Sequence, residues 1–396
     1  MSIFSHIIGQ EHAVTEVIRA VQDATSVERT DGAMTHAWLF TGPPGSGRST
    51  LATSFAGALV CSRQGCGECI DCRNVAAGIH PDVEHVIPEG VTYAIKDTTA
   101  LIERASLLPT KAPWHIIIIE DVDRFTLDAA AVLLKSLEEP PPRTVWMLCA
   151  PTSDDVFETI RSRCRLVTLH TPSLDAIAHQ LVDRYGIDLP MASFAARVAQ
   201  GHIGRARALA IDESVRIRRR EILDIPTKLN SIGSCYTLAT QIVANAEADT
   251  DAIVAQLDEQ DERDIRVTFG EGAQGSGLKS IERQKRTAIK DFEKRAKTRR
   301  RRVLSDQYSR ILLDLTGYYR DVLVIQSGSD VELINEEMRA EITNIADRDD
   351  TRETLMRIDA IRETRDNLIA NVNALSAFES LLTVLRTPAL SRISIA

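Results

Sequence analysis

Aromatic residues are scarce in this sequence, at 5% of its 396 residues, and several other features are missing altogether. No run of eighteen apolar residues occurs, and the first twenty residues lack a basic start followed by an apolar core. Neither a fixed-period repeat nor an extended low-complexity tract is present. Hydrophobic residues at 44% and charged residues at 26% are ordinary globular values. We therefore expect a soluble, cytoplasmic protein with no membrane partner.

Length and charge constrain the organisation of the chain further. A chain of 396 residues is long enough for two to four domains that each bury a core. The formal net charge of −9 would discourage binding to polyanions if it were spread evenly. However, residues 279–302 contain about a dozen Lys and Arg against three acidic residues. The average therefore conceals one strongly basic segment.

An α/β domain is predicted over residues 1–170. Short apolar runs alternate there with helical patterns, as a parallel sheet covered by helices requires. A helix is expected at 127–139, because its apolar periodicity stops at three consecutive prolines. The expected strands are the three apolar runs 36–41, 115–120 and 144–149.

The rest of the chain is predicted to be helical. Residues 171–213 carry short amphipathic segments, such as 174–185 and 192–200, without a strand signal. Residues 214–396 are again helical in pattern, apart from a Gly-rich stretch at 268–277 that predicts a flexible loop. With the basic residues that follow, this loop forms an inserted excursion over 268–302.

A glycine-rich segment between a predicted strand and a predicted helix has the pattern of a phosphate-binding loop (P-loop). Its glycines let successive backbone N–H groups face an anion, and the helix N-terminus adds partial positive charge. Arg48 stands where Lys is usual, and a planar guanidinium differs from a compact ammonium, so the loop fold is expected more firmly than ATP binding. Ser49 is a candidate hydroxyl ligand for magnesium. The candidate nucleotide-binding residues of this segment are Gly42, Gly45, Gly47, Arg48, Ser49 and Thr50.

Two acidic residues, Glu120 and Asp121, end the second predicted strand. A nucleotidase of this type usually has Asp followed by Glu, so here Glu120 would stand at the metal position and the shorter Asp121 at the water-polarising position. A shift of about 1 Å in a catalytic base can cost on the order of 10²-fold in rate. For catalysis we favour the alternative that these acids only terminate the strand in solvent.

Four of the seven cysteines lie within twelve residues, with the spacing C-x4-C-x2-C-x2-C. A disulfide framework is not indicated, because the chain is long and has no secretory signal. Four thiolates at this spacing can close a tetrahedral shell around zinc and leave no open position for a substrate. The predicted ligands, for which reduced free thiols are the alternative, are Cys61, Cys66, Cys69 and Cys72 over residues 61–72.

Two arginines, Arg161 and Arg163, follow the third predicted strand. An arginine suits a phosphate presented by a neighbouring subunit, since its fork donates two hydrogen bonds and stays charged. Taken alone, such a pair is more often a set of surface salt-bridge partners.

Taken together, these motifs make the chain similar to the bacterial clamp-loader subunits of DNA polymerase III, within the wider AAA+ group. The resemblance covers about residues 3–210, and its most specific parts are the Leu-Leu-Lys-x-Leu-Glu-Glu-Pro-Pro run and the Ser-Arg-Cys motif. The matching segments are Ile8-Gly9-Gln10, His36-Ala37, the four cysteines, His80-Pro81-Asp82, Leu133 to Pro141 and Ser162-Arg163-Cys164.

The resemblance implies an α/β AAA+ P-loop domain with a zinc-binding module, a small helical lid and an all-α C-terminal collar that oligomerises. It also implies that Arg163 is a finger offered in trans to ATP on an adjacent motor subunit, with Thr152 near the sensor-1 position and Arg205 at the sensor-2 position. The implied partners are gamma/tau and delta subunits, and through the complex a sliding clamp and primed DNA.

Among the subunits of this family, the chain resembles delta-prime. Arg48 and the Glu120-Asp121 pair depart from the gamma/tau motor pattern, and the segment from Asn371 to Leu382 looks like the C-terminal helix of a delta-prime collar. Its own ATPase is then expected to be weak or absent. A gamma/tau-type motor ATPase and a nucleotide-free structural scaffold are the alternatives.

The basic segment 279–302 departs from the family pattern. It could be a solvated helix of the collar, or it could contact DNA phosphates or an acidic partner in a salt-dependent way. Its only aromatic residue is Phe292, so base stacking is not indicated.

Overall fold

The computed structural model describes residues 2–26, 32–88, 92–269 and 278–386, with backbone only for 260–269 and 278–298. The chain divides into two compact units, Met1–Asp212 and Glu213–Ala396. Each unit buries its own hydrophobic core, so each is described by itself.

A five-stranded parallel sheet forms the centre of the first unit, in the order β2-β3-β4-β1-β5. Strands β1, β3 and β4 are those expected from the apolar runs. The two remaining strands were not expected, because each has only four residues, two of them polar, and they are the outermost strands of the sheet. The bounds are β1 Ala37–Thr41, β2 Val83–Val86, β3 His115–Ile119, β4 Thr144–Ala150 and β5 Arg165–Thr168.

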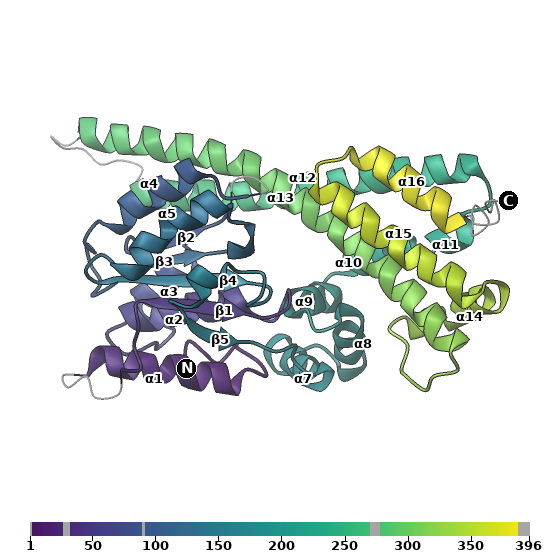
Figure 1. Ribbon diagram of the computed structural model, residues 1–396, viewed down its shortest axis with the longest axis horizontal. Coiled ribbons are helices and arrows are strands. Elements are labelled where there is room, and N and C mark those ends of the chain that lie inside the picture. Colours follow the sequence, from purple (N-terminus) through teal and green to yellow (C-terminus); the bar gives the residue numbers. More distant parts are fainter. Residues whose placement is uncertain (1, 27–31, 89–91, 270–277, 387–396) are drawn as a thin grey trace. The chain divides into compact units, whose positions relative to one another are not determined.

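Helices cover both faces of this sheet (Figure 1). Because successive strand residues point to opposite faces, Trp38 and Phe40 pack with Phe55 of α2, whereas Leu39 packs with Leu133 of α5. The predicted helix at 127–139 is confirmed as α5, which ends at Glu138, two residues before the first proline. The helices of this layer are α1 Glu11–Thr25, α2 Arg48–Val60, α3 Ile70–Ala76, α4 Ile95–Ala105, the 3-10 turn η1 Val122–Arg124, α5 Leu127–Glu138 and α6 Glu158–Arg161.

Three helices complete the first unit and pack on one another in sequence: α7 Leu174–Tyr185, α8 Leu189–Ala199 and α9 Ile203–Ile211. Ser173 caps α7 by accepting a hydrogen bond from the N–H of Ala176. The segment expected at 192–200 begins earlier, at Leu189, because Pro190 fits the first helical turn.

The second unit is entirely helical over its described residues. Tyr318, Tyr319 and Phe378 are buried at its centre. The predicted loop at 268–277 needs a correction, since α12 continues through Phe269; residues 270–277 lie outside the described residues. None of the described helices is long and apolar enough to cross a membrane. Its helices are α10 Glu213–Leu223, α11 Ile225–Lys228, α12 Ile232–Phe269, α13 Leu278–Gln326, the 3-10 turn η2 Glu336–Met338, α14 Arg339–Arg348, α15 Thr351–Ile369 and α16 Ala374–Arg386.

Candidate functional site

The phosphate-binding loop has the predicted setting between β1 and α2. The sheet order places it at the carboxyl ends of the strands, where parallel α/β sheets bind ligands. Gly47 caps α2 with φ 96°, a left-handed conformation that glycine adopts without strain. The N-terminus of α2 therefore opens directly onto the loop, as an anion site requires.

A lid residue, His202, lies against this loop. A Cβ at Gly45 would stand 2.4 Å from Cγ of His202, so only glycine fits there. His202 also caps α9, because its Nδ1 lies 3.2 Å from the N–H of Arg205. Arg205, the candidate sensor-2 residue, is 8% exposed in the first turn of that helix. The lid and the loop thus meet through a histidine to which the sequence reasoning gave no role.

The Ile-Gly-Gln motif near the start of the chain has a structural role, which its Gln10 side chain provides. Its Nε2 donates to the carbonyl of His170 at 2.6 Å and to that of Ser46, within the loop, at 3.4 Å. Its Oε1 accepts from the N–H of His170 at 3.0 Å. The motif therefore ties the N-terminal segment, the loop and the end of β5 together.

The guanidinium of Arg48 extends into an acidic environment. Its Nη1 is buried and has no hydrogen-bond partner among the described residues, and the same holds for Oδ1 of Asp123. Burial and the neighbouring charge of Asp121 raise the pKa of Asp123, while the charges of Arg124 and Arg48 oppose this. An unsatisfied buried donor beside the loop is compatible with an anionic ligand.

The carboxylate of Glu120 is engaged inside the chain. Glu120 is 5% exposed, and its Oε1 lies 2.8 Å from Nε2 of His85 on β2. The hydroxyl of Tyr93 donates to the backbone carbonyl of Glu120 at 2.6 Å. Next to it, Asp121 has φ 50°, and its Oδ2 lies 3.6 Å from Nη2 of Arg124. The expectation that both acids end the strand in solvent is therefore wrong for Glu120, which is buried and contacts His85.

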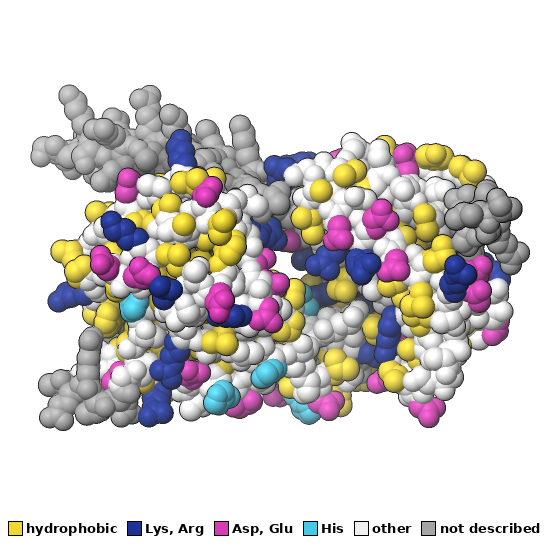
Figure 2. Space-filling view, viewed as in Figure 1, with side chains coloured by type: hydrophobic (Ala, Val, Ile, Leu, Met, Phe, Trp, Pro, Cys, Tyr) yellow, Lys and Arg dark blue, Asp and Glu magenta, His cyan; other side chains and the backbone are white. Residues whose placement is uncertain are grey.

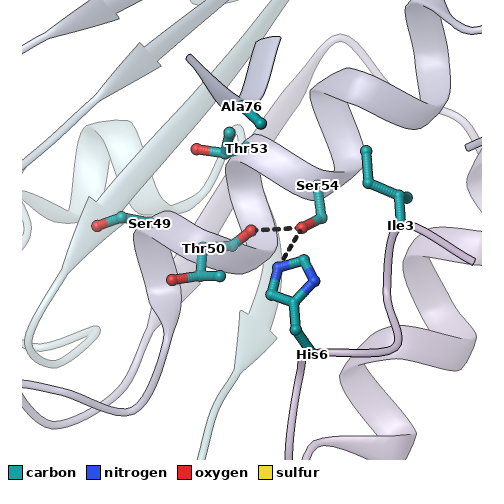
Figure 3. A pocket seen from close by; sticks show the side chains of 7 residues that line it. All are labelled: Ile3, His6, Ser49, Thr50, Thr53, Ser54 and Ala76. Atoms are coloured by element: carbon teal, nitrogen blue, oxygen red, sulfur yellow. Dashed lines mark hydrogen bonds between the residues drawn. The ribbon is translucent and has the colours of Figure 1, made fainter. Parts of the chain in front are cut away.

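Ser49 and Thr50 line a cavity of about 290 Å³ beside the first turns of α2 (Figure 3). In this view His6 points toward Ser54, whose hydroxyl donates to the carbonyl of Thr50 at 2.7 Å. Burial and the nearby charge of Arg184 lower the pKa of His6. The cavity is therefore lined by hydroxyl groups and a histidine that is neutral at neutral pH.

Thr152, the candidate sensor-1 residue, is exposed in the turn after β4. Its hydroxyl donates to Oδ2 of Asp155 at 2.7 Å and accepts from the N–H of Asp155 at 3.2 Å. Its side chain is thus used to close a local turn.

The four clustered cysteines lie close together at the end of α2 and the start of α3. Their sulfur atoms are all within 4.8 Å of one another. Cys61 Sγ is 3.8 Å from Cys66 Sγ and 3.7 Å from Cys69 Sγ. Zn–S bonds of about 2.3 Å in a tetrahedron place sulfurs about 3.8 Å apart. The cluster could therefore bind a metal with small movements of its side chains.

Backbone N–H groups prepare part of this cluster for the thiolate form. Those of Glu68 and Cys69 lower the pKa of Cys66 to about 6. For Cys61, burial opposes ionisation, but several N–H groups outweigh it and lower the pKa. Burial raises the pKa of Cys72, and a bound cation would favour its thiolate form.

Arg163 lies on the surface between α6 and β5. Its side chain is 36% exposed, and its Nη2 forms an ion pair with Oε1 of Glu138 at the end of α5. Its Nη1 donates to the carbonyl of Thr159 at 2.8 Å and to the hydroxyl of Ser162 at 3.1 Å. The Leu-Glu-Glu-Pro-Pro run and the Ser-Arg-Cys motif thus meet in one contact. Sequence spacing alone did not predict it.

These observations define a P-loop protein with a parallel sheet and a helical second unit. Residues 19–173 match the family model described as "DNA polymerase III, delta subunit". Subunit delta' of Bacillus subtilis is 31% identical over 154 residues, covering 38% of this chain and 47% of that protein. Subunit tau/gamma of Haemophilus influenzae is 27% identical over 230 residues, covering 55% of this chain and 32% of that protein.

Among solved structures, a DNA polymerase III gamma subunit-related protein from Thermotoga maritima is similar with a TM-score of 0.40 and 16% identity, covering 95% of this chain and 98% of that one. The chain spans about a third to a half of the length of the two curated relatives, 32% and 47% respectively. The P-loop unit of this chain is thus similar to bacterial clamp-loader subunits of DNA polymerase III.

Proposed function

We propose that this chain is a delta-prime-type clamp-loader subunit, which assembles with gamma/tau and delta subunits and helps to place a sliding clamp on primed DNA. In this role it completes a neighbour's ATP site with Arg163 and hydrolyses little or no ATP itself. The observation that carries the proposal is the contact between Glu120 and His85, 2.8 Å long, at the position where a motor subunit would hold its metal.

Two further features support a weak nucleotide site. Arg48 replaces the usual lysine with a larger, planar cation, and His202 packs against Gly45 of the loop. By contrast, the contacts of Arg163 with Glu138, Thr159 and Ser162 are all exposed to solvent. A subunit built this way contributes to a neighbouring site more readily than to its own.

We further propose that zinc binds the four clustered cysteines and has a structural role. Four sulfur ligands close the coordination shell, so the metal holds α2 and α3 together and supplies no catalytic water. Cys69 also caps α3 by accepting from the N–H of Cys72, which couples the cluster to the start of that helix.

The test is Arg163→Ala in a loader reconstituted with gamma/tau and delta subunits. We expect normal assembly, reduced DNA-stimulated ATP hydrolysis and reduced clamp loading. Arginine fingers contribute on the order of 10³–10⁵ in rate at one site, but other sites in the complex make the total loss smaller. Arg161→Ala is the matched control, because Arg161 pairs with exposed Asp154 on the same surface. Unchanged hydrolysis by the Arg163 variant would refute the trans role.

A gamma/tau-type motor is the second candidate, favoured by the match to the tau/gamma subunit over 230 residues. Tight ATP binding with turnover by the isolated chain would support it. Weak binding without turnover fits the delta-prime proposal, and no binding at all fits a nucleotide-free scaffold.

A further inference from the structure

Two helices of the second unit continue well beyond its core. Among the described side chains, which exclude 260–298, the last buried one of α12 is Val254 and the first buried one of α13 is Tyr308. At 1.5 Å per residue, α12 extends about 20 Å past Val254, and α13 begins about 45 Å before Tyr308. Figure 1 shows α13 running on as one helix past the bundle that it forms with α14 and α15. We call residues 255–269 and 278–302 the arm.

The arm carries a charge of the opposite sign to the chain. It contains fourteen Lys and Arg against eight Asp and Glu, a net charge of +6, whereas the whole chain has −9. On the face shown in Figure 2, Lys and Arg are interspersed with Asp and Glu over both units. The excess of positive charge is therefore a property of the arm, and it remains whichever way the individual side chains point.

Ion pairs within the unit use only part of this charge. Nη1 of Arg299 lies 2.9 Å from Oδ1 of Asp258, and Nε of Arg300 lies 2.7 Å from Oδ1 of Asp251, so acids of α12 hold the base of α13. Both pairs involve the end of the arm that leads into the core of the unit. Complete pairing of the eight acidic residues of the arm, together with the pair between Arg300 and Asp251, would still leave an excess of five cations.

The α13 part of the arm, residues 278–302, contains few apolar residues. Ile281, Ala288, Phe292 and Ala296 recur along α13 at the spacing of a two-helix seam, and α12 packs against α13. The other apolar residues of this part of α13 are Ile289, next to Ala288, and Leu278 at its first residue, and all remaining positions are polar or charged. A protein interface would need apolar side chains and is depleted of Lys, whereas Lys and Arg dominate contacts with nucleic-acid phosphates.

We propose that the arm binds the phosphate backbone of duplex DNA without reading its sequence. The cations of 279–302 span about 35 Å of helix, so their ligand must present negative charge over a similar length. Duplex DNA does so, with one charge per about 1.7 Å of its axis. Base stacking has little part, since the arm contains only two aromatic residues, Phe269 and Phe292. The inference rests on the charge and length of the arm and is independent of the loader assignment.

The experiment measures binding of the full chain to a fluorescent duplex of about 30 base pairs at about 50 and 200 mM salt. Both variants below replace four cations with glutamine, which is a comparably good helix former. The control positions are exposed residues of the same unit. The arm variant is Lys285→Gln, Arg286→Gln, Lys294→Gln and Arg295→Gln, and the control variant is Arg310→Gln, Arg352→Gln, Arg362→Gln and Arg365→Gln.

We expect the arm variant to bind at least about tenfold more weakly at low salt. The slope of the logarithm of its binding constant against the logarithm of salt concentration should decrease in size by about 2–4. The control should bind within about twofold of the parent. Arg286→Lys with Arg295→Lys should bind like the parent, because a phosphate contact needs the positive charge and not the forked geometry of a guanidinium. Circular dichroism measures whether the glutamine variant keeps its helix content. If it does not, the charge-preserving lysine variant still tests the proposal.

Absence of duplex binding by the parent at low salt, or an arm variant that binds like the parent, would overturn the proposal. So would tighter binding to a single strand, or binding to polyglutamate but not to duplex, which would indicate an acidic protein instead. Assembly with the other subunits is measured separately by size-exclusion chromatography. A chain that binds duplex but fails to assemble refutes the loader role alone, and one that assembles without binding duplex refutes the arm alone.

Discussion

Removal of the Asp82 carboxylate should destabilise the P-loop unit strongly. Asp82 is 2% exposed. Its Oδ1 accepts from the N–H of Thr110 at 2.5 Å and from the hydroxyl of Thr110 at 2.8 Å. Its Oδ2 accepts from the N–H groups of Lys111 at 2.8 Å and Ala112 at 2.7 Å. This single side chain therefore organises the turn that leads into β3.

Asp82→Ala leaves these donors without their acceptor. Hydrogen bonds to charged groups contribute about 1.5–3 kcal/mol each, but water reaches part of the turn, so we expect a loss of about 3–5 kcal/mol. Asp82→Asn, which keeps one carbonyl oxygen, should lose about half of this. Asp154→Ala is the control, because the Asp154 side chain is 88% exposed and should cost less than about 0.5 kcal/mol.

The assay is urea unfolding followed by tryptophan fluorescence. All three tryptophans, Trp38, Trp114 and Trp146, belong to the first unit and therefore report on it alone. Burial opposes ionisation of Asp82, but the N–H groups of Thr110 and its neighbours outweigh it and lower its pKa. Its stabilising contribution is then complete above the unfolded pKa and is lost as the pH falls through the lower folded pKa. A loss below about 1 kcal/mol for Asp82→Ala at neutral pH would refute the reasoning.

Three other outcomes are expected. Protein purified without added zinc should contain close to one equivalent of zinc, and Cys66→Ser should lose the metal and lower the thermal midpoint; less than about half an equivalent with four free thiols by titration would contradict this. Arg48→Lys should raise ATP affinity by calorimetry more than it raises phosphate release, because Glu120 stays bound to His85; robust hydrolysis by the parent chain would overturn the claim. Glu138→Gln should leave assembly intact and keep or raise the ATPase of the reconstituted loader, since it frees Arg163; a loss as large as that of Arg163→Ala would show that Glu138 is needed to position the finger.

The sequence predicted those features that depend on neighbouring residues. Strands β1 and β3 are continuous apolar runs, and every residue in both is buried. The cysteine cluster was equally evident, because all four cysteines lie within one short segment. In each case the determining chemistry is local, so its pattern is visible without the fold.

Contacts between distant segments were not predictable from a single sequence. His85 and Glu120 meet because β2 and β3 pair in parallel with His85 opposite Ile118. The sequence did not reveal β2, since it has only four residues and the two central ones, Glu84 and His85, are polar. His202 reaches Gly45 only because the lid folds back onto the loop. In these places the sheet register and the lid determine the site.

The energies of two contacts suggest how the proposed division of labour arises. Arg163 and Glu138 form a pair whose side chains are 36% and 50% exposed, and such surface pairs are worth about 0–1 kcal/mol. A phosphate on a neighbouring subunit can therefore displace Glu138 at little cost. Glu120 has a side chain only 6% exposed, and a hydrogen bond to a charged group contributes about 1.5–3 kcal/mol. Turning Glu120 toward a metal at its own loop would break that contact. Offering Arg163 to a neighbouring subunit therefore costs less than completing the ATP site of this chain.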